Sequence, residues 1–497
     1  MCGLIGVSGT SDAAKEVFLG LMNLQHRGQD GAGILTLGGH GAGNFNIQKG
    51  SGLVENIFSE RTFKGLRGQV AIGHTRYATI GRKDPNLLQP FLDYRAGIGL
   101  GHNGNIVNVY ALRRELVDQG LPLPASESDS EMILRLIANH LLETAPKVNG
   151  GPEKLSRGDE PEATDRLFSA IEHCMNKVVG AYSVVGLDAS GSLFGFRDPH
   201  GIRPLVLGTR IDQDGKPSYA LASETIALRY LGYNDAQEIG PGEVVVIDAA
   251  GTVQRRELKR TSYSPCMFEW VYFARVESEI GGMPIYEARF QLGLILAQRL
   301  KDLSIEADVV VPVPETSRAA AIAIAEAMSL PFRELLIKNR YVQRTFILDG
   351  QEARQEAIRR KLFPIASEVA GKRVLVVDDS IVRGNTGSQI IDLLRQSGAS
   401  EVILVSTCPP IKNACFYGID FPSRTELVAC DSTDEEIAGK LGADKVVFQT
   451  LEGLKSALKQ ESLCTGCLTG DYPTDVSQAQ DFEARRLQDR QKTLRRS

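Results

Sequence analysis

The chain has 497 residues, of which 42% are apolar and 24% charged, and this composition suits a globular protein of two or three domains, each with a full core. The formal net charge of −5 and the lack of a basic stripe exclude a nucleic-acid footprint. No apolar run approaches the ~18 residues of a membrane helix and no basic signal region precedes Gly3, so we expect a cytoplasmic protein without a membrane partner.

The N-terminus opens with Met1, Cys2 and an apolar strand from Gly3 to Val7. Removal of Met1 would leave Cys2 with a free α-amine of pKa ~7.7 to 8.0, which can take the proton of the thiol directly or through a water. Cys2 could then act as a nucleophile without a histidine partner. On its own, however, the short Met-Cys-Gly pattern also fits a buried structural cysteine.

Three Gly-containing motifs follow a predicted amphipathic helix at Ala14 to Leu24, namely Gln25 to Gly33, Gly73 to Thr79 and Gly101 to Asn105. Each lies at a strand end or in a loop, where polar groups can converge on a pocket. Together with Cys2, these motifs resemble the glutamine amidotransferase domain of the N-terminal-nucleophile hydrolases over roughly residues 2 to 245. The resemblance implies a four-layer αββα fold and a cysteine nucleophile that hydrolyses glutamine through a thioester.

The resemblance also implies a role for four further residues. The side-chain amide of Asn103 and the backbone N–H of Gly104 match the two donors of an oxyanion hole. Arg76 matches the group that holds the α-carboxylate of glutamine, and Asp129 matches the acid that holds the α-ammonium. Catalysis is thus expected from Cys2, Asn103 and Gly104.

Simpler interpretations of some of these residues stay open. Asp129 lies in a Ser-x-x-Glu pattern, Ser128 to Glu131, that can cap a helix at Met132 to Leu142, and Arg76 can form a surface ion pair. Three histidines suggest a Cys-His dyad, but without an orienting Asn or Asp pattern they are expected to be structural. They are His26, His74 and His102.

The remainder of this half contributes framework. Residues 147–164 are polar and Gly- and Pro-containing, typical of a surface insertion without a site. We expect a structural turn at Gly195 to Leu205. The regular elements are a helix at Leu167 to Val178 and strands at Ala181 to Leu187, Ser218 to Ala222 and Glu243 to Ile247. A basic and polar stretch from Gly251 to Tyr263 then marks a boundary, so the first domain is predicted at residues 2–250.

Strand and helix patterns alternate in the second domain, predicted at residues 260–475 before a charged tail at 476–497. The expected elements are Tyr286 to Leu300, Val309 to Val313, Thr316 to Met328, Val374 to Val377, Ser388 to Gln396 and Val402 to Ser406. Such alternation predicts a parallel sheet with helices on both faces and ligands at the carboxyl ends of its strands.

The Val374 strand runs directly into two acids and a Gly, Ser and Thr turn. Free backbone N–H groups, the hydroxyls of Ser380 and Thr386 and the cation of Arg383 suit a phosphate ester. Asp378 and Asp379 would repel that phosphate, so they suit sugar hydroxyls or a Mg²⁺ that carries a pyrophosphate. The alternative is an ordinary Asp-Asp-Ser turn after a core strand.

This stretch resembles the phosphoribosylpyrophosphate (PRPP) signature of the type I phosphoribosyltransferases. The resemblance implies that PRPP is bound by Asp378, Asp379, Ser380, Arg383, Gly384, Asn385 and Thr386, with Asn385 where relatives usually have Thr. It aligns Thr316, Asp378 and Asp379 with magnesium-associated positions. It also implies a basic loop that closes over the pyrophosphate with Lys338, Arg340 and Arg344, although Gln343 replaces a common Gly and a solvated basic loop is the alternative.

Both halves together, in this order, resemble the glutamine PRPP amidotransferases, or amidophosphoribosyltransferases, over about residues 2 to 475. The family converts PRPP, glutamine and water to 5-phosphoribosylamine, glutamate and pyrophosphate, the first committed step of de novo purine synthesis. The resemblance further implies a homotetramer with feedback inhibition by AMP, ADP or GMP. The alternatives are a non-catalytic sensor of PRPP or purines and another amidotransferase with a cysteine nucleophile.

Eight cysteines are too few for a disulfide scaffold in a chain of this length. The Cys464-x-x-Cys467 pair alone fits a redox pair, zinc or an iron–sulfur site. Cysteines at matching places in the cluster-bearing branch of the family imply a structural 4Fe-4S cluster held by Cys266, Cys415, Cys464 and Cys467, with tetrahedral zinc as the alternative. Cys174, Cys408 and Cys430 lie in helix or strand patterns and are expected in the core.

Overall fold

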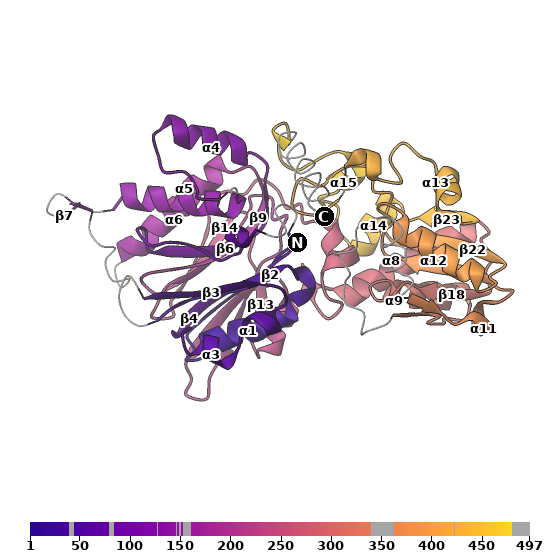
Figure 1. Cartoon of the computed structure of the whole chain (residues 1–497), viewed down its shortest axis with the longest axis horizontal. Helices are drawn as coiled ribbons and strands as arrows, with labels where there is room; N and C mark the ends of the chain where they lie inside the picture. The colour runs from indigo at the N-terminus through magenta and orange to yellow at the C-terminus, as the bar shows by residue number, and fades with distance from the viewer. Residues whose placement is uncertain are drawn as a thin grey trace.

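The computed structural model describes residues 1–38, 44–78, 84–126, 128–145, 147–148, 151–152, 161–338, 362–421 and 423–479. These residues form two domains that lie side by side, the N-terminal one indigo to magenta and the C-terminal one salmon to yellow in Figure 1. Much of the predicted insertion, nearly all of the predicted basic loop and residues 480–497 of the predicted tail lie outside the described residues.

The N-terminal domain contains two antiparallel sheets within the described residues. The seven-stranded sheet has the order β13 (Asn234–Glu238), β11 (Val206–Ile211), β12 (Pro217–Ala222), β1 (Gly3–Ser8), β4 (Val70–Arg76), β2 (Gly31–Leu37) and β3 (Phe45–Ser51). The six-stranded sheet has the order β15 (Val253–Glu257), β14 (Glu243–Ile247), β10 (Leu193–Arg197), β9 (Gly180–Asp188), β6 (Ile98–Ile106) and β5 (Phe91–Asp93). Because β15 pairs with β14, the second sheet continues beyond residue 250.

Helices cover the outer face of each sheet. The first sheet packs against α1 (Ala13–Asn23), α2 (Val54–Ile57), α3 (Glu60–Phe63) and α7 (Thr225–Tyr230), and the second against α4 (Val109–Asp118), α5 (Asp129–Glu143) and α6 (Pro161–Lys177). Side chains alternate between the faces of a strand, so Leu4 of β1 lies in the core between the sheets while Ile5 and Val7 pack under α1. The predicted αββα arrangement is confirmed. β7 (Lys147–Val148) pairs antiparallel with β8 (Gly151–Pro152).

The C-terminal domain is built on the predicted parallel sheet. Its order over the described residues is β18 (Val309–Pro312), β21 (Arg373–Asp378), β22 (Glu401–Ser406) and β23 (Lys445–Phe448). One face packs on α12 (Asn385–Gln396) and α13 (Asp434–Leu441), the other on α8 (Ile285–Asp302) and α9 (Arg318–Met328). In β21, Val374 and Val376 face one core and Leu375 and Val377 the other, so the predicted strand is buried on both sides.

Smaller elements complete this domain. They are β16 (Glu279–Ile280), β17 (Met283–Pro284), β19 (Leu336–Lys338), β20 (Leu362–Pro364), α11 (Ala366–Val369), α14 (Leu451–Leu458), α15 (Gly466–Thr469) and a π-helical turn at Glu269–Phe273. The predicted start of α12 at Ser388 was too late, since Gly384 precedes the first helical residue, Asn385. No helix in the described ranges combines the length and the apolar character needed to cross a bilayer.

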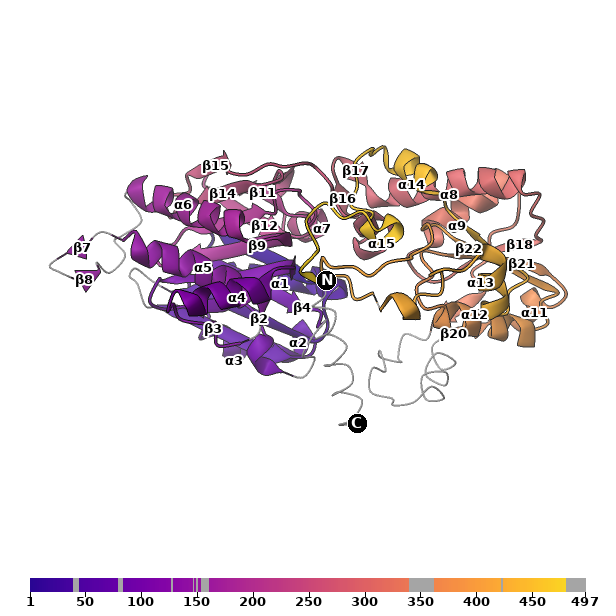
Figure 2. The ribbon, with the colours of Figure 1, turned by 90° about the horizontal axis from the view of Figure 1, so that it is seen from above.

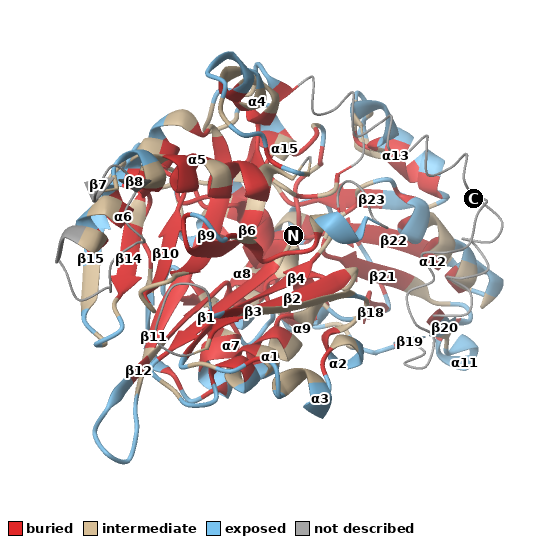
Figure 3. Ribbon diagram, turned by 60° about the vertical axis from the view of Figure 1, so that its left-hand side comes forward, coloured by how far each residue is buried: buried red, intermediate tan, exposed pale blue. Residues whose placement is uncertain are grey.

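A further core joins the two domains. It contains Met1, Val107 and Ile202 of the N-terminal domain together with Trp270 and Tyr417 of the C-terminal domain. Figure 2 shows α15 (yellow) close to the domain boundary and to the N-terminus. In Figure 3 the N-terminus lies where buried segments of both domains meet. The beginning of the chain is therefore enclosed by residues from its second half.

Candidate functional site

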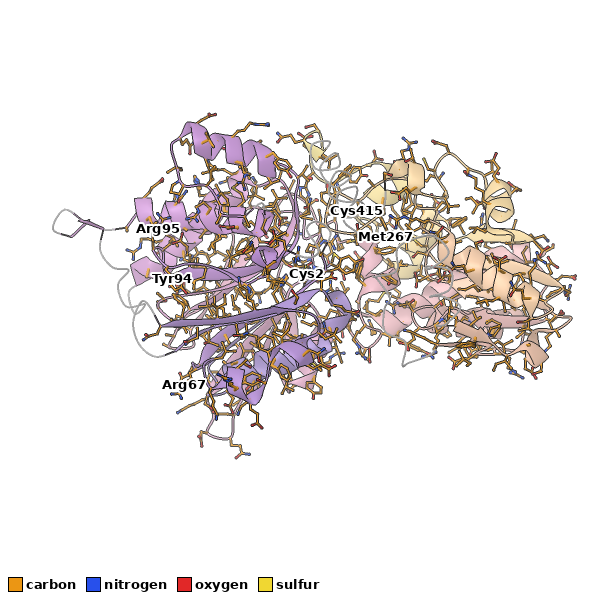
Figure 4. All side chains as sticks on the ribbon, in the orientation of Figure 1. Cys2, Arg67, Tyr94, Arg95, Met267 and Cys415 are labelled. Carbon is orange, nitrogen blue, oxygen red and sulfur yellow. The ribbon has the colours of Figure 1, made fainter. Side chains whose placement is uncertain are left out.

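A pocket of about 770 Å³ adjoins the N-terminus. Its lining includes all five residues that the amidotransferase resemblance identified, namely Cys2, Arg76, Asn103, Gly104 and Asp129. They come from the start of β1, the end of β4, the strand β6 and the first turn of α5. Figure 4 shows Cys2 near the boundary between the domains.

Cys2 is held by its backbone. Its N–H donates to Asn103 Oδ1 at 3.0 Å, and its carbonyl accepts from Arg27 Nε at 3.1 Å. Its Sγ atom lies 4.0 Å from the carbonyl oxygen of Tyr77. Met1 is buried, and burial, helped by the cations Arg27 and Arg203, lowers the pKa of its α-amine to about 6. The backbone of Cys2 is thus held at both its N–H and its carbonyl, and this places the thiol in the pocket.

Asn103 and Gly104 present two features of an anion-binding site. Asn103 is fully buried, and its Nδ2 has no hydrogen-bond partner within the described ranges. A buried donor of this kind costs free energy unless a ligand accepts from it. Gly104 has a φ of +143°, and a Cβ there would lie 1.9 Å from the Ala181 carbonyl oxygen, so only glycine fits.

Arg76 and Asp129 lie at the same pocket. Arg76 is buried at the end of β4, and burial lowers its pKa against the opposing effect of Cys2, Asp30 and Asp84. Asp129 accepts from the N–H of Ile106 at 3.2 Å and from that of Ser130 at 2.8 Å. A cation and an acid therefore flank the thiol.

The reciprocal capping box that the Ser128 to Glu131 pattern allows does not form. Ser128 Oγ accepts from the Ser130 N–H at 3.3 Å, but Glu131 accepts from the N–H groups of Ala125 and Ser126 at 2.7 and 2.8 Å. Glu131 thus fixes the loop before α5, because that loop folds back onto the helix and brings its donors within reach. α5 itself begins at Asp129, earlier than the predicted Met132.

The three histidines have surroundings of their own. His26 Nε2 contacts Glu224 Oε1 at 2.7 Å, and His102 Nδ1 contacts Ser130 Oγ at 3.0 Å. His74 is fully buried, and burial, with nearby Arg76, lowers its pKa to about 3. The expected structural role is consistent with these contacts.

Sequence reasoning missed the support behind Cys2. Arg27 was part of a recognised motif, but no role was assigned to it. It is fully buried, its Nη2 donates to both carboxylate oxygens of Glu269 at 2.7 and 2.9 Å, and its Nη1 pairs with Glu224. Glu269 belongs to the C-terminal domain, so the residue that binds the Cys2 carbonyl is anchored across the boundary. Buried charges need such partners, but the sequence does not say which residues they are.

A second pocket, of about 260 Å³, lies at the carboxyl end of β21. It is lined by Asp378 and by the unbroken run from Ser380 to Gly387, which includes the predicted residues Arg383, Gly384, Asn385 and Thr386. Its position is where a parallel sheet binds ligands. The loop and the first turn of α12 thus form a cradle as the sequence predicted.

The two acids of this loop are buried side by side. Asp379 is absent from the pocket lining; its carboxylate accepts from the hydroxyl of Thr316 and, at 2.7 Å, from that of Ser380. Burial raises the pKa of both acids, and the charge of Asp379 raises that of Asp378 further. A cation at this position would relieve the repulsion. Thr316, Asp378 and Asp379 are therefore neighbours, as the resemblance implied.

The predicted basic residues are only partly visible. Lys338 is exposed at the end of β19, while Arg340 and Arg344 lie outside the described residues. Arg383 Nε lies 3.4 Å from Glu426 Oε1 and is 40% exposed. Lys338 and Arg383 are both accessible to an anionic ligand.

Four cysteines gather in the core between the domains. Cys266, Cys415 and Cys464 are buried there, and Cys467 packs against it. The backbones of Cys266 and Cys464 pair in an isolated parallel β-bridge. The Cys467 carbonyl accepts from the N–H groups of Lys412 and Asn413 at 3.0 and 2.9 Å.

The thiols are not in a ligating arrangement in this structure. Across the described ranges, no group of three or more His, Cys, Asp or Glu side chains is set to hold a metal ion. Arg203 lies buried beside three of these cysteines, and its Nε and Nη2 have no partner in the described part of the chain. Its Nη1 pairs with Glu269, so the guanidinium keeps two buried donors next to the sulfur atoms, and this fits an anionic metal–thiolate centre.

The prediction for the remaining cysteines was wrong in one case. Cys174 and Cys408 are buried as expected. Cys430 is only partly buried, and its Sγ contacts Arg424 Nε at 3.2 Å and Asp431 Oδ2 at 3.3 Å. The apolar residues before it form a turn after a short 3₁₀ helix, and not a strand.

Comparison with known proteins gives the same two parts. A model described as a phosphoribosyl transferase domain matches residues 288–424, and one described as a glutamine amidotransferase domain matches residues 61–151. The amidophosphoribosyltransferase of Lachancea kluyveri is 40% identical over 490 residues, which cover 96% of this chain and 93% of that protein. That of Escherichia coli K12 is 39% identical over 468 residues, with 93% and 89% covered.

A solved structure also matches over nearly the whole length. It is described as glutamine PRPP amidotransferase from B. subtilis complexed with ADP and GMP. The TM-score is 0.82 at 36% sequence identity, and the match covers 96% of this chain and 98% of that one.

Proposed function

This chain belongs to the amidophosphoribosyltransferase family, and from that premise we propose how its two pockets divide the reaction. The enzyme converts PRPP, glutamine and water to 5-phosphoribosylamine, glutamate and pyrophosphate in purine biosynthesis. Glutamine is hydrolysed at Cys2, and the ammonia is consumed at the loop from Asp378 to Thr386. The observation that supports this division is the presence of both pockets on one chain, the first lined by all five expected residues and the second by Asp378 and the run from Ser380 to Gly387.

At the first pocket, Cys2 is the nucleophile once Met1 has been removed. Its α-amine takes the thiol proton, the sulfur attacks the amide carbon of glutamine, and the proton passes to the departing nitrogen as ammonia leaves. Water then attacks the thioester, releasing glutamate and restoring the thiol. Asn103 Nδ2 and the Gly104 N–H stabilise the oxyanion in both steps, a pair whose loss costs ~2.7 to 4 kcal/mol per donor.

The same pocket holds the other end of glutamine. Arg76 pairs with the α-carboxylate and Asp129 with the α-ammonium, because these two opposite charges line the same pocket as the thiol. Such contacts bind substrate and transition state alike, so they set mainly KM. The surrounding loop, fixed by Glu131, supports Asp129.

At the second pocket, the cradle from Ser380 to Thr386 binds the 5-phosphate, and Asp378 and Asp379 hold the ribose hydroxyls. Ammonia attacks C1 of the ribose as the bond to pyrophosphate breaks. Thr316, Asp378 and Asp379 are the residues that would hold Mg²⁺ near the pyrophosphate, where the ion supplies charge neutralisation to the leaving group. Lys338, Arg340 and Arg344 are assigned to the pyrophosphate as well.

Ammonia must pass between the pockets without becoming ammonium in bulk water. Met1, directly before Cys2, lies in the core shared by both domains, and Gly418 of the second domain lines the Cys2 pocket, which supports an internal route. We also propose domain limits of 2–250 and 260–475, with the first domain extended to Glu257 because β15 pairs with β14. The region from 476 onward is not a free tail at its start, since Val476 and Ala479 pack in the core between the domains.

A 4Fe-4S cluster held by Cys266, Cys415, Cys464 and Cys467 is also proposed, with a structural role. Their common core and the two buried N–H donors of Arg203 that lack a partner within the described residues support it. Iron and sulfide analysis with a visible absorbance spectrum tests the cluster, and zinc in their place would refute it. Feedback by purine nucleotides is proposed from the ADP and GMP of the B. subtilis structure, and a cytoplasmic homotetramer from the family.

Replacement of the nucleophile tests the division of labour. Cys2→Ala should abolish phosphoribosylamine formation from glutamine, because no thioester can form. Synthesis from added ammonia should continue at the wild-type rate, because the second pocket is intact. Both rates are measured as PRPP-dependent pyrophosphate release, and loss of both activities in a folded variant would contradict two separable sites.

A further inference from the structure

The oxyanion strand of the first pocket is in direct contact with the second domain. Gly418 has a φ of +101°, and a Cβ at this position would lie 2.9 Å from the carbonyl oxygen of Gly104, 3.0 Å from its carbonyl carbon and 3.3 Å from its Cα. Real Cβ atoms essentially never approach other atoms closer than 3.0 Å. The two backbones therefore meet with no room for a side chain, although 314 residues separate them in the sequence.

A hydrogen bond fixes the same contact one residue further along the strand. Asn105 Nδ2 donates to the carbonyl oxygen of Phe416 at 2.8 Å. Asn105 is 6% exposed, so water competes little for its amide. Gly104 thus contacts the backbone of Gly418, and its neighbour Asn105 is hydrogen-bonded to Phe416 of the same segment.

The segment from Cys415 to Gly418 is itself well supported. The Tyr417 N–H donates to Cys415 Sγ at 3.4 Å, and the Tyr417 hydroxyl bonds to Thr474 Oγ1 at 2.8 Å. The Tyr472 hydroxyl donates to the Ala414 carbonyl at 2.6 Å, and its ring packs 5.0 Å from that of Phe416. The contact with Gly104 is therefore made by a braced part of the C-terminal domain, and Figure 4 shows Cys415 at this boundary.

We propose that the segment Phe416–Gly418 is a positioning element of the glutaminase site: it fixes the carbonyl side and the Cα of Gly104, and so the direction of the adjoining Gly104 N–H toward the oxyanion. The inference rests on the proposed function of Gly104. It adds that the first domain does not complete its own active site: an oxyanion donor depends on a residue of the phosphoribosyltransferase domain. Oxyanion donors act only when they lie within a few tenths of an ångström of the developing charge, and removing one costs about 10²- to 10³-fold in kcat.

Gly418→Ala tests this contact. The new methyl group must push the Gly104 backbone away and displace the N–H donor without removing it. The kcat for glutamine hydrolysis should therefore fall by about 10- to 100-fold, less than for complete loss of a donor. The KM for glutamine should change little, because Arg76 and Asp129 are untouched. Synthesis from added ammonia should be unchanged, because Gly418 does not line the second pocket.

Gly371→Ala is the matched control. Gly371 lies in the same domain at a φ of +72°, and within the described ranges nothing is found within 4 Å of its would-be Cβ. It carries the same kind of backbone strain without the contact. Both activities should stay at the wild-type level in this variant.

The outcomes separate the inference from the proposed function. If the wild type hydrolyses glutamine at Cys2 and Gly418→Ala does so equally fast, the positioning role is wrong while the proposed function stands. An equal loss of glutamine- and ammonia-dependent synthesis would also overturn the inference, since it would indicate general damage. Should thermal melting show Gly418→Ala unfolded, Asn105→Ala decides: a lower kcat with glutamine alone supports positioning, and an unchanged one refutes it.

Discussion

The two pockets of this enzyme are built in opposite ways. The phosphoribosyl pocket is lined by Asp378 and one unbroken run of residues that ends a strand and begins a helix. The glutaminase pocket collects its residues from the N-terminus, from β4, β6, α4 and α5, and from Gly418 in the other domain. A local site is specified by a short stretch of sequence, whereas a distributed site depends on how distant parts of the chain pack.

This difference predicts how far away a substitution can act. At the phosphoribosyl pocket, harmful substitutions should be confined to the loop and to Thr316, its contact on a neighbouring strand end. At the glutaminase pocket, the Cys2 carbonyl accepts from Arg27, which is anchored by Glu269 of the C-terminal domain, and the Gly104 backbone meets Gly418 of that domain. Substitutions in that domain should therefore reduce glutaminase activity with little effect on transfer, and three variants sharpen the comparison.

The largest effect is expected from Asp378→Asn in the local site. Loss of this carboxylate should bring transfer to background with glutamine and with ammonia alike, while glutamine hydrolysis itself continues, because the first pocket does not contain Asp378. Glutamate and pyrophosphate release are measured in parallel. Transfer that survives with ammonia alone would mean that the two sites are less independent than their architecture indicates.

The same variant makes a prediction about stability. Burial and Asp379 raise the pKa of Asp378 above its usual value of 3.8, so the native state binds a proton more readily than the unfolded chain. The free energy of unfolding of the wild type therefore falls as the pH rises from about 4, the pKa in the unfolded chain, through the raised pKa of Asp378 in the native state. Asp378→Asn keeps the acceptor for the Asp379 N–H and should melt at a higher temperature than the wild type at pH 7, with the gain disappearing below about pH 4.

A smaller effect is expected from Asn103→Ala in the distributed site. It removes one oxyanion donor, so kcat with glutamine should fall by about 10²- to 10³-fold. Ammonia-dependent synthesis should be kept. Steady-state kinetics with each nitrogen source decide this, and a change in glutamine KM alone would show that Asn103 contributes to binding only.

The smallest effect is expected from Tyr472→Phe, because Tyr472 reaches the glutaminase site only through Ala414 and the segment Phe416–Gly418. It removes the hydrogen bond to Ala414 and keeps the ring contact with Phe416, at a cost of about 1 kcal/mol in the free energy of unfolding. Glutaminase kcat should fall a few-fold with transfer unchanged. Chemical denaturation and the two kinetic assays measure these effects, and equal losses in both activities would contradict the asymmetry between the pockets.

Patterns with local causes were predictable. β21 is recognisable because four apolar residues must be buried on both faces, and the cradle after it because Gly, Ser and Thr form such turns. The nucleophile could be proposed because its chemistry needs only its own amine. The αββα layers came from a family resemblance and are confirmed.

The misses concern side chains whose partners are chosen by the way a loop or a domain boundary folds, whether those partners are near in the sequence or distant. The Ser128 to Glu131 pattern left a capping box open as an alternative, but Glu131 fixes the preceding loop through Ala125 and Ser126. Cys430 was expected in the core and lies between Arg424 and Asp431. Nothing local in the sequence pairs Arg27 with Glu269.

The sequence by itself determined most of the strands and helices and indicated a candidate nucleophile and a candidate phosphate cradle, because periodicity, turn chemistry and adjacent functional groups act over a few residues. Only the tertiary structure decided that Gly418 meets Gly104, that Glu269 supports Cys2 through Arg27, and that four cysteines gather between the domains. These contacts arise when two cores close on each other. Which residues then meet depends on packing across the whole boundary, and no short stretch of the chain encodes it.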